Sequence, residues 1–441
     1  MHRTGMMEKA VISKNNFLRI GGGICLAVCV LVVGGCSLIS ARTQPPALSC
    51  DALQRIDENR FGFVNASRNF SAVSTLGAQW NQSFPGPFVW DTVQAERNQP
   101  FDFEAADEDV MNAQGIGEAT LGILWPYASW DQRGHGLRRE CAGSGHSESL
   151  PKDRCKPADT QAYVSFVTEV VERYDGDGLY DAEGLCVPIR HWESVPQVHL
   201  QNSIGGIGMF HGTPTDYYNV LRTTFRGVKG ACPQCDIHIG AIDAFDGKSV
   251  QWLDDVLLLG GAEFFDAVSV HTHASSAAED LLAVRNVLES YHQEKPIWVT
   301  ELTVDGTEAD DGSKIVRGSI ESFAAGAQKV FFSALDTDPE QVPSRFMFSL
   351  LDGEGNPRPA YTAVQTLIRM LGTFTGVEKI DNGIYLFNTK KYGEVYAVWD
   401  AGGVLPNGFA GEMHMSRLDG TEEVLDAGDI QLSNAPIFLY K

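Results

Sequence analysis

Short apolar runs alternate with longer amphipathic stretches over most of this 441-residue chain, and this alternation constrains its fold more than any other feature. Apolar runs bounded by turn signals indicate buried strands, and apolar positions spaced three and four apart indicate helices. The predicted strands are Arg60–Val64, Thr75–Gln82, Gly117–Trp125, Val187–Val198, Asp236–Ile242, Ala267–His273, Pro296–Glu301 and Lys329–Ala334. The predicted helices are Phe103–Gln114, Ala158–Tyr174, Thr213–Lys229, Ser249–Leu259, Ala278–Gln293 and Ser313–Ala327. Eight strands alternating with helices predict a (β/α)8 TIM barrel.

The pattern changes from Thr373 onward. Short β-branched and aromatic runs are separated there by turn signals such as Asp419-Gly420. The predicted strands of this part are Gly383–Phe387, Val395–Trp399, Gly411–Met415 and Pro436–Tyr440. We therefore expect a barrel over residues 56–372 and a small β-sandwich-like domain without a catalytic constellation over residues 373–441.

The first 36 residues read as a targeting segment. Basic residues precede an uninterrupted small and apolar run, Gly21–Gly35. This run is shorter than a membrane-spanning helix requires. The run ends in Val33-Gly34-Gly35-Cys36, which resembles the lipobox of bacterial lipoproteins. The resemblance implies a signal peptide over residues 1–36, a lipid on Cys36, a tether over residues 37–55, and an exported protein anchored to the membrane of the bacterial cell envelope. The alternative is an ordinary signal peptide with an incidental cysteine.

Six of the nine cysteines lie beyond this segment, and an even number in an exported protein predicts disulfides. Cys141 and Cys155 flank a polar loop and are the best candidate pair. Cys232 and Cys235 form a CxxC motif that predicts a tight local bridge. A zinc site is disfavoured because no second CxxC follows at suitable spacing, and a redox role is disfavoured because the motif follows a helix.

The formal net charge of −23 excludes nucleic acid and acidic surfaces as favoured partners, because like charges repel. Neutral ligands remain compatible with this charge. Asp175, Asp177 and Asp181 alternate with glycines in a way that could hold calcium. The segment lacks the full twelve-residue calcium-loop pattern, so a solvated acidic turn is the favoured reading. We expect no metal and no cofactor.

In a parallel barrel, the chemistry lies at the carboxyl ends of the strands. The apolar stretch Glu294–Val304 delivers Glu301 near such an end, where a carboxylate is costly unless it is paired or used. Aromatic rings and amides at the same rim suit a sugar, whose C–H faces stack on rings while its hydroxyls bond to amides. The candidate glycan-binding residues at these ends are Trp80, Asn81, Trp125, Trp192, His271 and His273.

Several segments together resemble the clan A glycoside hydrolases, especially family 39 and its neighbours, over nearly the whole mature chain. These segments are Leu76–Trp80, Pro100–Phe103 with Asp107, Arg173–Gly178, His191–Glu193, Val270–His273, Pro296–Glu301, Leu351–Gly353 and Pro359–Tyr361. Each motif alone is weak, but their order and spacing are fairly specific.

The resemblance implies a retaining glycoside hydrolase with two carboxylates. It places the nucleophile at Glu301 and the acid/base at the last position of a Trp-Glu-x-x-Asn-Glu motif. Here that motif ends in Pro196-Gln197, so the acid/base glutamate is replaced by Gln197. A glutamine amide keeps the shape but cannot transfer a proton at neutral pH, which slows ordinary glycoside cleavage.

Other groups near this position could supply the proton. Glu193 shares strand parity with Gln197 but lies about 13 Å deeper, so we expect a core carboxylate. His199, His271 and His273 are more reachable donors, although each is also readily explained as a hydrogen-bonded rim histidine.

Three functions are therefore open. The first is a divergent retaining hydrolase acting on β-linked glycans through Glu301. The second is a catalytically silent carbohydrate-binding lipoprotein, and the third is a scaffold that keeps the fold for packing alone. The retained Glu301 and His271 argue against the third, while Gln197 leaves enzymatic turnover uncertain.

Overall fold

The structure is a computed structural model of the chain. It describes residues 50, 58–66, 70–133, 150–200, 208–304, 311–333, 349–352, 354–399, 405 and 408–441. The predicted signal peptide, Cys36 with its lipid, and Cys141 lie outside these residues. Within the described part, no helix has the length and hydrophobicity needed to span a membrane.

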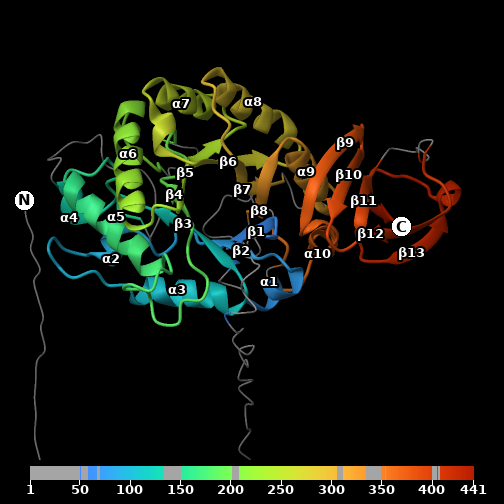
Figure 1. The fold of residues 1–441 in the computed structure, drawn as a ribbon, viewed down its shortest axis with the longest axis horizontal. Helices are drawn as coiled ribbons and strands as arrows, with labels where there is room; N and C mark the ends of the chain where they lie inside the picture. The colour runs from blue at the N-terminus through green and yellow to red at the C-terminus, as the bar shows by residue number, and fades with distance from the viewer. Residues whose placement is uncertain are drawn as a thin grey trace, which may run out of the picture. The chain divides into compact units, whose positions relative to one another are not determined.

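Eight parallel strands close into a barrel in chain order, with β1 pairing both β2 and β8 (Figure 1). The strands are β1 (Phe61–Val64), β2 (Trp80–Gln82), β3 (Ala119–Leu124), β4 (His191–Ser194), β5 (Asp236–Asp243), β6 (Ala267–His273), β7 (Ile297–Thr303) and β8 (Ala327–Phe332). The predicted TIM barrel is confirmed.

Helices follow the strands and surround the barrel. They are α1 (Phe70–Leu76), α2 (Trp90–Val93), α3 (Glu104–Gly115), α4 (Ser129–Gln132), α5 (Thr160–Tyr174), α6 (Pro214–Ala231), α7 (Gly247–Leu258), α8 (Ala277–Ser290), α9 (Asp311–Ala324) and α10 (Pro359–Leu371). A short 3-10 helix, η6 (Gly261–Phe264), precedes β6. All six predicted helices are present, while α1, α2, α4 and α10 were not predicted.

Two predicted strands are too long. The first part of Thr75–Gln82 belongs to α1, which ends before Gly77 in the left-handed region at φ 83°, a conformation that favours glycine at a helix end. The predicted strand Val187–Val198 is restricted to β4. Val195 and Gln197 follow it with φ values of 31° and 53°, so the chain turns out of the barrel wall there.

The amino-terminal end of the barrel interior is filled by a cluster that we call the lower cluster: Trp80, His191, His238, Trp298 and Lys329. The rings of His191 and Trp298 lie 4.4 Å apart, and Lys329 Nζ lies 4.2 Å from the centre of the Trp80 ring. Lys329 also donates a hydrogen bond to the carbonyl of Asn59 at 2.9 Å. The barrel is therefore a packed core at this end.

The C-terminal region forms an antiparallel sheet in the order β13-β12-β14-β11-β10-β9. Its strands are β9 (Phe374–Asp381), β10 (Ile384–Thr389), β11 (Gly393–Val398), β12 (Glu412–Arg417), β13 (Glu422–Asp426) and β14 (Ile437–Tyr440), with a 3-10 turn, η8 (Ala427–Asp429). The predicted C-terminal β region is confirmed, and β9 and β13 are additional strands.

Both faces of this sheet are apolar. One face joins the main core, where Phe374 meets Phe323 of α9 with ring centres 4.9 Å apart. The opposite face carries its own cluster, which includes Ile384, Met413 and Leu439. Side chains alternate between the two faces along each strand, as the period of two requires.

Two disulfides are described in full. Cys232–Cys235 confirms the predicted local bridge, and Cys50–Cys186 joins the start of the described chain to the segment before β4. Cys155 is also disulfide-bonded. Its predicted partner, Cys141, lies outside the described residues.

Candidate functional site

Three titratable side chains meet at the carboxyl ends of neighbouring strands. The register pairs Asp243 of β5 with His271 of β6, and His271 with Glu301 of β7. Because paired positions on adjacent parallel strands are next to each other in the barrel wall, the three side chains form a contiguous row.

His271 lies between the two carboxylates. Its Nδ1 is 3.3 Å from Asp243 Oδ1 and 3.5 Å from Glu301 Oε2. The side chains of Asp243 and His271 are 4% and 8% exposed, whereas that of Glu301 is 37% exposed. Glu301 is therefore the member of the row that a ligand can reach.

Asp243 also holds two groups from the loop after β4. It accepts hydrogen bonds from Gln197 Nε2 at 3.0 and 3.3 Å, and it pairs with His199 Nε2 at 3.2 Å. A glycine makes this contact possible, because a Cβ on Gly240 of β5 would lie 1.8 Å from the Val195 carbonyl oxygen. The close approach of loop and strand holds Gln197 over Asp243.

The charges of the row follow from these contacts. Burial alone would raise the pKa of Asp243, but bonds from His199, His271 and Gln197 hold that pKa well below its ordinary value. Burial would lower the pKa of His271, but the charges of Glu301 and Asp243 raise it to about 9. At neutral pH, His271 is therefore a cation between two acidic groups.

The pKa of Glu301 is raised above its ordinary value. Burial is the largest cause and the charge of Asp243 adds to it, while His271 opposes both. The oxygens of Asp243 and Glu301 that flank His271 are no more than about 7 Å apart, since they lie 3.3 and 3.5 Å from the same nitrogen. Asp243 nevertheless cannot act as an acid, because its low pKa keeps it ionised.

Glu193 lies in the barrel interior, as its strand parity predicts. It is fully buried, accepts a hydrogen bond from Gln82 Nε2 at 3.2 Å and receives the Ala241 N–H at 3.4 Å. Burial raises its pKa. It lies inside the barrel, and its charge adds to those that raise the pKa of His271.

Four of the predicted glycan-binding residues, Trp80, Trp192, Asn81 and Trp125, are buried away from the site. Trp80 belongs to the lower cluster, at the opposite end of β2 from the rim. Trp192 is fully buried and packs on Phe88, with ring centres 5.2 Å apart, outside the barrel wall. Its neighbour Glu193 points inward, and adjacent strand residues face opposite ways.

Asn81 is also turned away from the site, for the same reason. It lies next to the inward-facing Gln82, is fully buried, and donates a hydrogen bond to Ser83 Oγ at 3.2 Å. Trp125 does lie at the end of β3, but it is fully buried and its Nε1 donates to the Pro85 carbonyl at 2.6 Å. Of the predicted ligand contacts, His271 and His273 are the ones beside Glu301.

Sequence reasoning assigned no role to two rim residues. Asp243 organises the row, and Phe245 follows two residues later with its side chain 50% exposed. The Phe245 ring lies 4.8 Å from that of His273, edge to face. The available signal was the position of Asp243 and Phe245 at the end of a predicted strand.

The acidic turn after α5 brings carboxylate oxygens of Asp175, Asp177 and Asp181 within 4.8 Å of one another. Asp181 accepts the N–H groups of Gly176 and Gly178 at 2.9 and 2.7 Å. These bonds are typical of an acidic turn that satisfies its own backbone.

No protein-family model and no curated protein sequence matches this chain. Its fold does match solved structures. A glucosidase from Croceicoccus marinus aligns with a TM-score of 0.58 and 14% identity, covering 84% of this chain and 90% of the glucosidase. A GH30 endoxylanase from Clostridium papyrosolvens aligns with a TM-score of 0.55 and 11% identity, covering 87% and 96%. An alpha-L-arabinofuranosidase from Thermotoga maritima gives 0.56 and 11%, also covering 87% and 96%. At these identities the likeness is one of fold: the chain has a fold shared with glycoside-cleaving enzymes.

Proposed function

We propose that this chain is a divergent retaining glycoside hydrolase that acts on β-linked glycans, with Glu301 as nucleophile and Gln197 in place of the usual acid/base. One observation carries the proposal. Glu301 is the accessible carboxylate of a row whose other members, His271 and Asp243, are buried and charged. Three buried or half-buried charges at one rim are costly to maintain unless they serve chemistry.

The row prepares Glu301 to attack. The His271 cation, 3.5 Å away, stabilises the ionised carboxylate that a nucleophile requires. Asp243 in turn holds His271 protonated. Attack of a Glu301 oxygen on the anomeric carbon forms a glycosyl–enzyme bond and breaks the bond to the leaving oxygen.

Gln197 limits which leaving groups can depart. Its amide donates to Asp243 and carries no acidic proton, so it can neither protonate the leaving oxygen nor deprotonate the attacking water. General acid–base assistance contributes roughly 10²–10⁴-fold. Glycosides whose leaving group departs unaided are therefore the substrates of choice.

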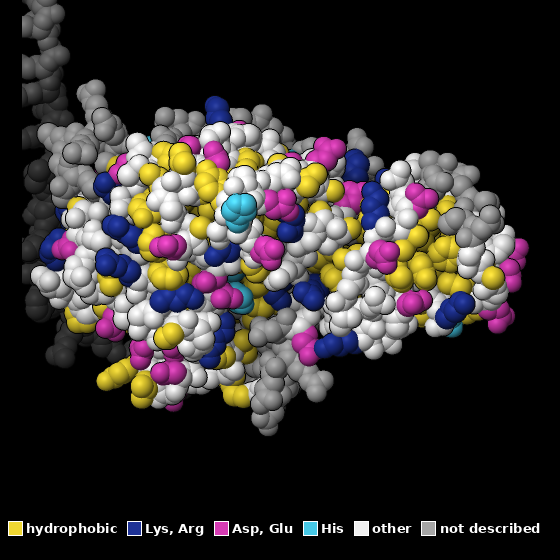
Figure 2. All heavy atoms as spheres, turned by 45° about the horizontal axis from the view of Figure 1, so that its top comes forward, with side chains coloured by type: hydrophobic (Ala, Val, Ile, Leu, Met, Phe, Trp, Pro, Cys, Tyr) yellow, Lys and Arg dark blue, Asp and Glu magenta, His cyan; other side chains and the backbone are white. Residues whose placement is uncertain are grey.

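The rim also offers a surface for a sugar ring. Phe245 is half exposed next to His273, and an exposed aromatic face at this rim suits the C–H face of a pyranose. Acidic and basic side chains are interspersed over the face drawn in Figure 2, without a continuous positive area. The net charge of −23 likewise favours a neutral glycan over an anionic one.

The proposed place of action is the bacterial cell envelope. It rests on the lipobox-like Val33–Cys36 and on the apolar run before it. A lipid on Cys36 would tether the exported barrel to the membrane, within reach of envelope glycans.

The alternative function is a catalytically silent, glycan-binding lipoprotein on the same fold. It is favoured by Gln197, because among the described residues no carboxylic acid with a raised pKa faces Glu301 across the row. Glu193, whose pKa is raised, lies buried beneath the rim. The same surface around Phe245 would then bind glycans without cleaving them.

Turnover of activated glycosides tests the proposal. Purified protein is assayed with 2,4-dinitrophenyl β-glycosides of several sugars, with and without azide. Azide is a small anion that can attack the glycosyl–enzyme without base assistance, so it should accelerate turnover and yield a glycosyl azide. Glu301→Gln should reduce turnover by about 10³-fold or more, because it removes the nucleophile.

The outcomes separate the functions. Azide-accelerated turnover that requires Glu301 supports the hydrolase. Absence of turnover together with calorimetric binding of β-linked oligosaccharides, weakened by Phe245→Ala, supports the binding protein. Absence of both turnover and glycan binding contradicts the hydrolase and the binding protein alike. The hypothesis of a scaffold that keeps the fold for packing alone would then remain.

A further inference from the structure

We infer that the C-terminal sheet carries a second saccharide-binding site, separate from the barrel rim. A pocket of about 540 Å³ opens on the sheet face that is turned away from the barrel core. Its volume lies within the range of small-molecule sites, roughly 300–1,000 Å³. The inference does not depend on hydrolysis at Glu301.

The floor of the pocket is apolar, and two aromatic rings packed against each other form one of its walls. Ile384 and Met413 are buried at 6% and 2% exposure and belong to the sheet's own cluster. Tyr396 and Phe409 form an edge-to-face pair with ring centres 4.9 Å apart. An edge-to-face pair leaves a ring face free for a third flat group, such as the C–H face of a sugar.

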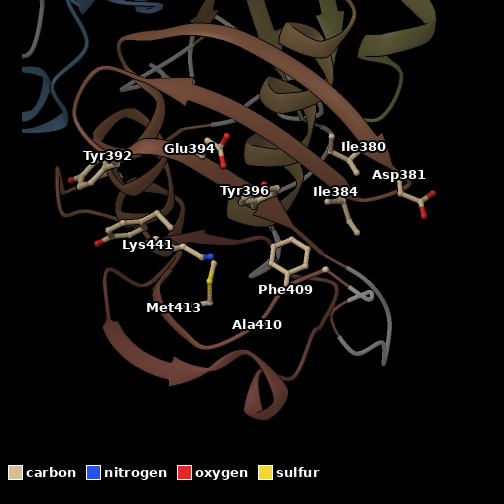
Figure 3. A pocket seen from close by; sticks show the side chains of 12 residues that line it. Ile380, Asp381, Ile384, Tyr392, Glu394, Tyr396, Phe409, Ala410, Met413 and Lys441 are labelled. Atoms are coloured by element: carbon tan, nitrogen blue, oxygen red, sulfur yellow. The ribbon is translucent and has the colours of Figure 1, made fainter.

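Polar groups surround this apolar part. Glu394 and Asp381 lie at the pocket as exposed carboxylates, and Figure 3 shows the amino end of Lys441 pointing toward Met413 and Phe409. Glu394 accepts a hydrogen bond from the hydroxyl of Tyr396, and this bond adds to burial in raising the pKa of that tyrosine. A carboxylate has about four lone-pair sites, so Glu394 can accept hydrogen bonds from ligand hydroxyls as well.

The mixture of groups selects the class of ligand. A purely apolar ligand would cover the apolar floor but would make no hydrogen bonds to the two carboxylates and the ammonium group around it. An anionic ligand would meet two acidic groups and one basic group. A neutral saccharide satisfies both parts, because its hydroxyls bond to the charged groups while its ring stacks on the aromatic wall.

Figure 2 shows apolar side chains gathered on the C-terminal sheet. A glycan-active barrel with a second saccharide site would hold a long glycan at two points. The second contact then acts at a raised effective concentration and strengthens binding without a new contact at the rim.

Methyl NMR of the full chain, labelled with ¹³C-methyl methionine, tests the inference. The Met413 signal is assigned from a Met413→Leu variant, and cellotetraose and xylotetraose are the neutral probes. At least one of them should shift the Met413 signal saturably. Tyr396→Ala and Phe409→Ala should each weaken this binding by about tenfold, since each removes part of the stacking surface.

Matched variants separate this site from the rim and from general damage to the sheet. Val424→Ala removes an exposed apolar side chain of β13 outside the pocket and should leave the titration unchanged. Tyr396→Phe keeps the ring and should retain affinity within about threefold. The combined variant Glu301→Gln, Phe245→Ala should still show the Met413 shift, even if the barrel proves to have no activity.

Three results would overturn the inference. The first is a Met413 signal that neither tetrasaccharide moves at millimolar concentration. The second is saccharide binding that Tyr396→Ala leaves unchanged. The third is a Met413 shift with tetramethylammonium but with neither sugar, which would identify an organic-cation site in place of a saccharide site.

Discussion

The two ends of the barrel interior both bury histidines, yet the histidines differ in charge. At the rim, the charges of Glu301 and Asp243 raise the pKa of His271 to about 9. In the lower cluster, burial and the Lys329 cation lower the pKa of His191 to about 4, and burial beside His191 lowers that of His238 well below its ordinary value. The rim histidine is a cation at neutral pH, and the lower histidines are neutral.

Burial alone would neutralise all of these histidines, so their neighbours make the difference. Two carboxylates flank His271. His191 has the Trp298 ring centre at 4.4 Å and one carboxylate, Asp236, at 3.7 Å, and the Lys329 cation opposes its protonation. The lower cluster holds neutral histidines and one buried cation, Lys329, which lies over the Trp80 ring and donates to the Asn59 carbonyl. The rim keeps a charged row, which costs folding free energy and therefore indicates a function.

The largest expected gain of activity comes from Gln197→Glu. The new carboxyl group would lie next to Asp243, whose low pKa keeps it ionised, and like charge would raise the pKa of the introduced group. It would then act as a proton donor, and turnover of alkyl glycosides should rise by about 10²-fold. Steady-state kinetics would show this gain, and azide should no longer accelerate the reaction.

Gln197→Met is the matched control, because it keeps the side-chain volume without a titratable group. An equal gain in both variants would contradict proton donation. No gain in Gln197→Glu would show that the rim lacks a working nucleophile or a bound substrate in the right place.

Asp243→Asn should destabilise the fold by about 3 kcal/mol at pH 7, because it leaves the buried His271 cation with one carboxylate fewer. The folded pKa of Asp243 is lowered, so its stabilisation is present above its unfolded pKa of about 4 and is lost as the pH falls. The pKa of His271 is raised to about 9. Its contribution to folding stability is therefore present at low pH and is lost as the pH rises through that value.

The stability difference between the natural protein and Asp243→Asn should therefore be largest between about pH 5 and the unfolded histidine pKa of about 6.5, and it should shrink on both sides of this range. Urea unfolding at a series of pH values measures it. A difference that does not vary with pH would mean that Asp243 acts through packing and not through charge.

Glu301→Gln should change the pKa of His271 and leave the pKa of His191 unchanged. Removing the Glu301 charge should lower the pKa of His271 from about 9 toward its ordinary value of 6.5. The pKa of His191, at the other end of the barrel, should stay at about 4. Histidine ring NMR over a pH series measures both, and an unmoved His271 would show that Glu301 is not its partner in solution.

Lys329→Met should have the smallest effect. It removes the cation that lowers the pKa of His191, so that pKa should rise above about 4. Stability should change by no more than about 1 kcal/mol, because an apolar side chain of similar length replaces a buried charge. Turnover at the rim should not change, and a loss of turnover would contradict the separation of the two ends.

The alternation of strands and helices could be predicted because it is local. Ala267–His273 was predicted with its observed bounds, and Glu301 lies in the predicted seventh strand. The positions where the chain turns out of a strand could not be predicted in the same way. The left-handed conformations of Val195 and Gln197, which shorten β4, arise from the loop's contact with β5 and not from their residue types.

The alternation of side chains along β4 also predicts on which side of the barrel wall each residue lies. The parity that places Glu193 inside the barrel places Trp192 outside it, where the ring packs on Phe88. Trp192 could therefore have been removed from the predicted ligand contacts without a structure. Trp80 could not, because its distance from the rim depends on where the short strand β2 begins.

By itself the sequence determined the barrel, the C-terminal strands and the position of Glu301, because these follow from periodicity and from strand ends. Tertiary structure alone decided that Asp243 is the centre of the rim, that His271 lies between two carboxylates, and that a pocket opens on the outer face of the C-terminal sheet. The physical reason is that charge and burial depend on distances between residues far apart in the chain. Asp243 lies on β5 and Glu301 on β7, and only the pairing of both strands with β6 brings them to the same histidine.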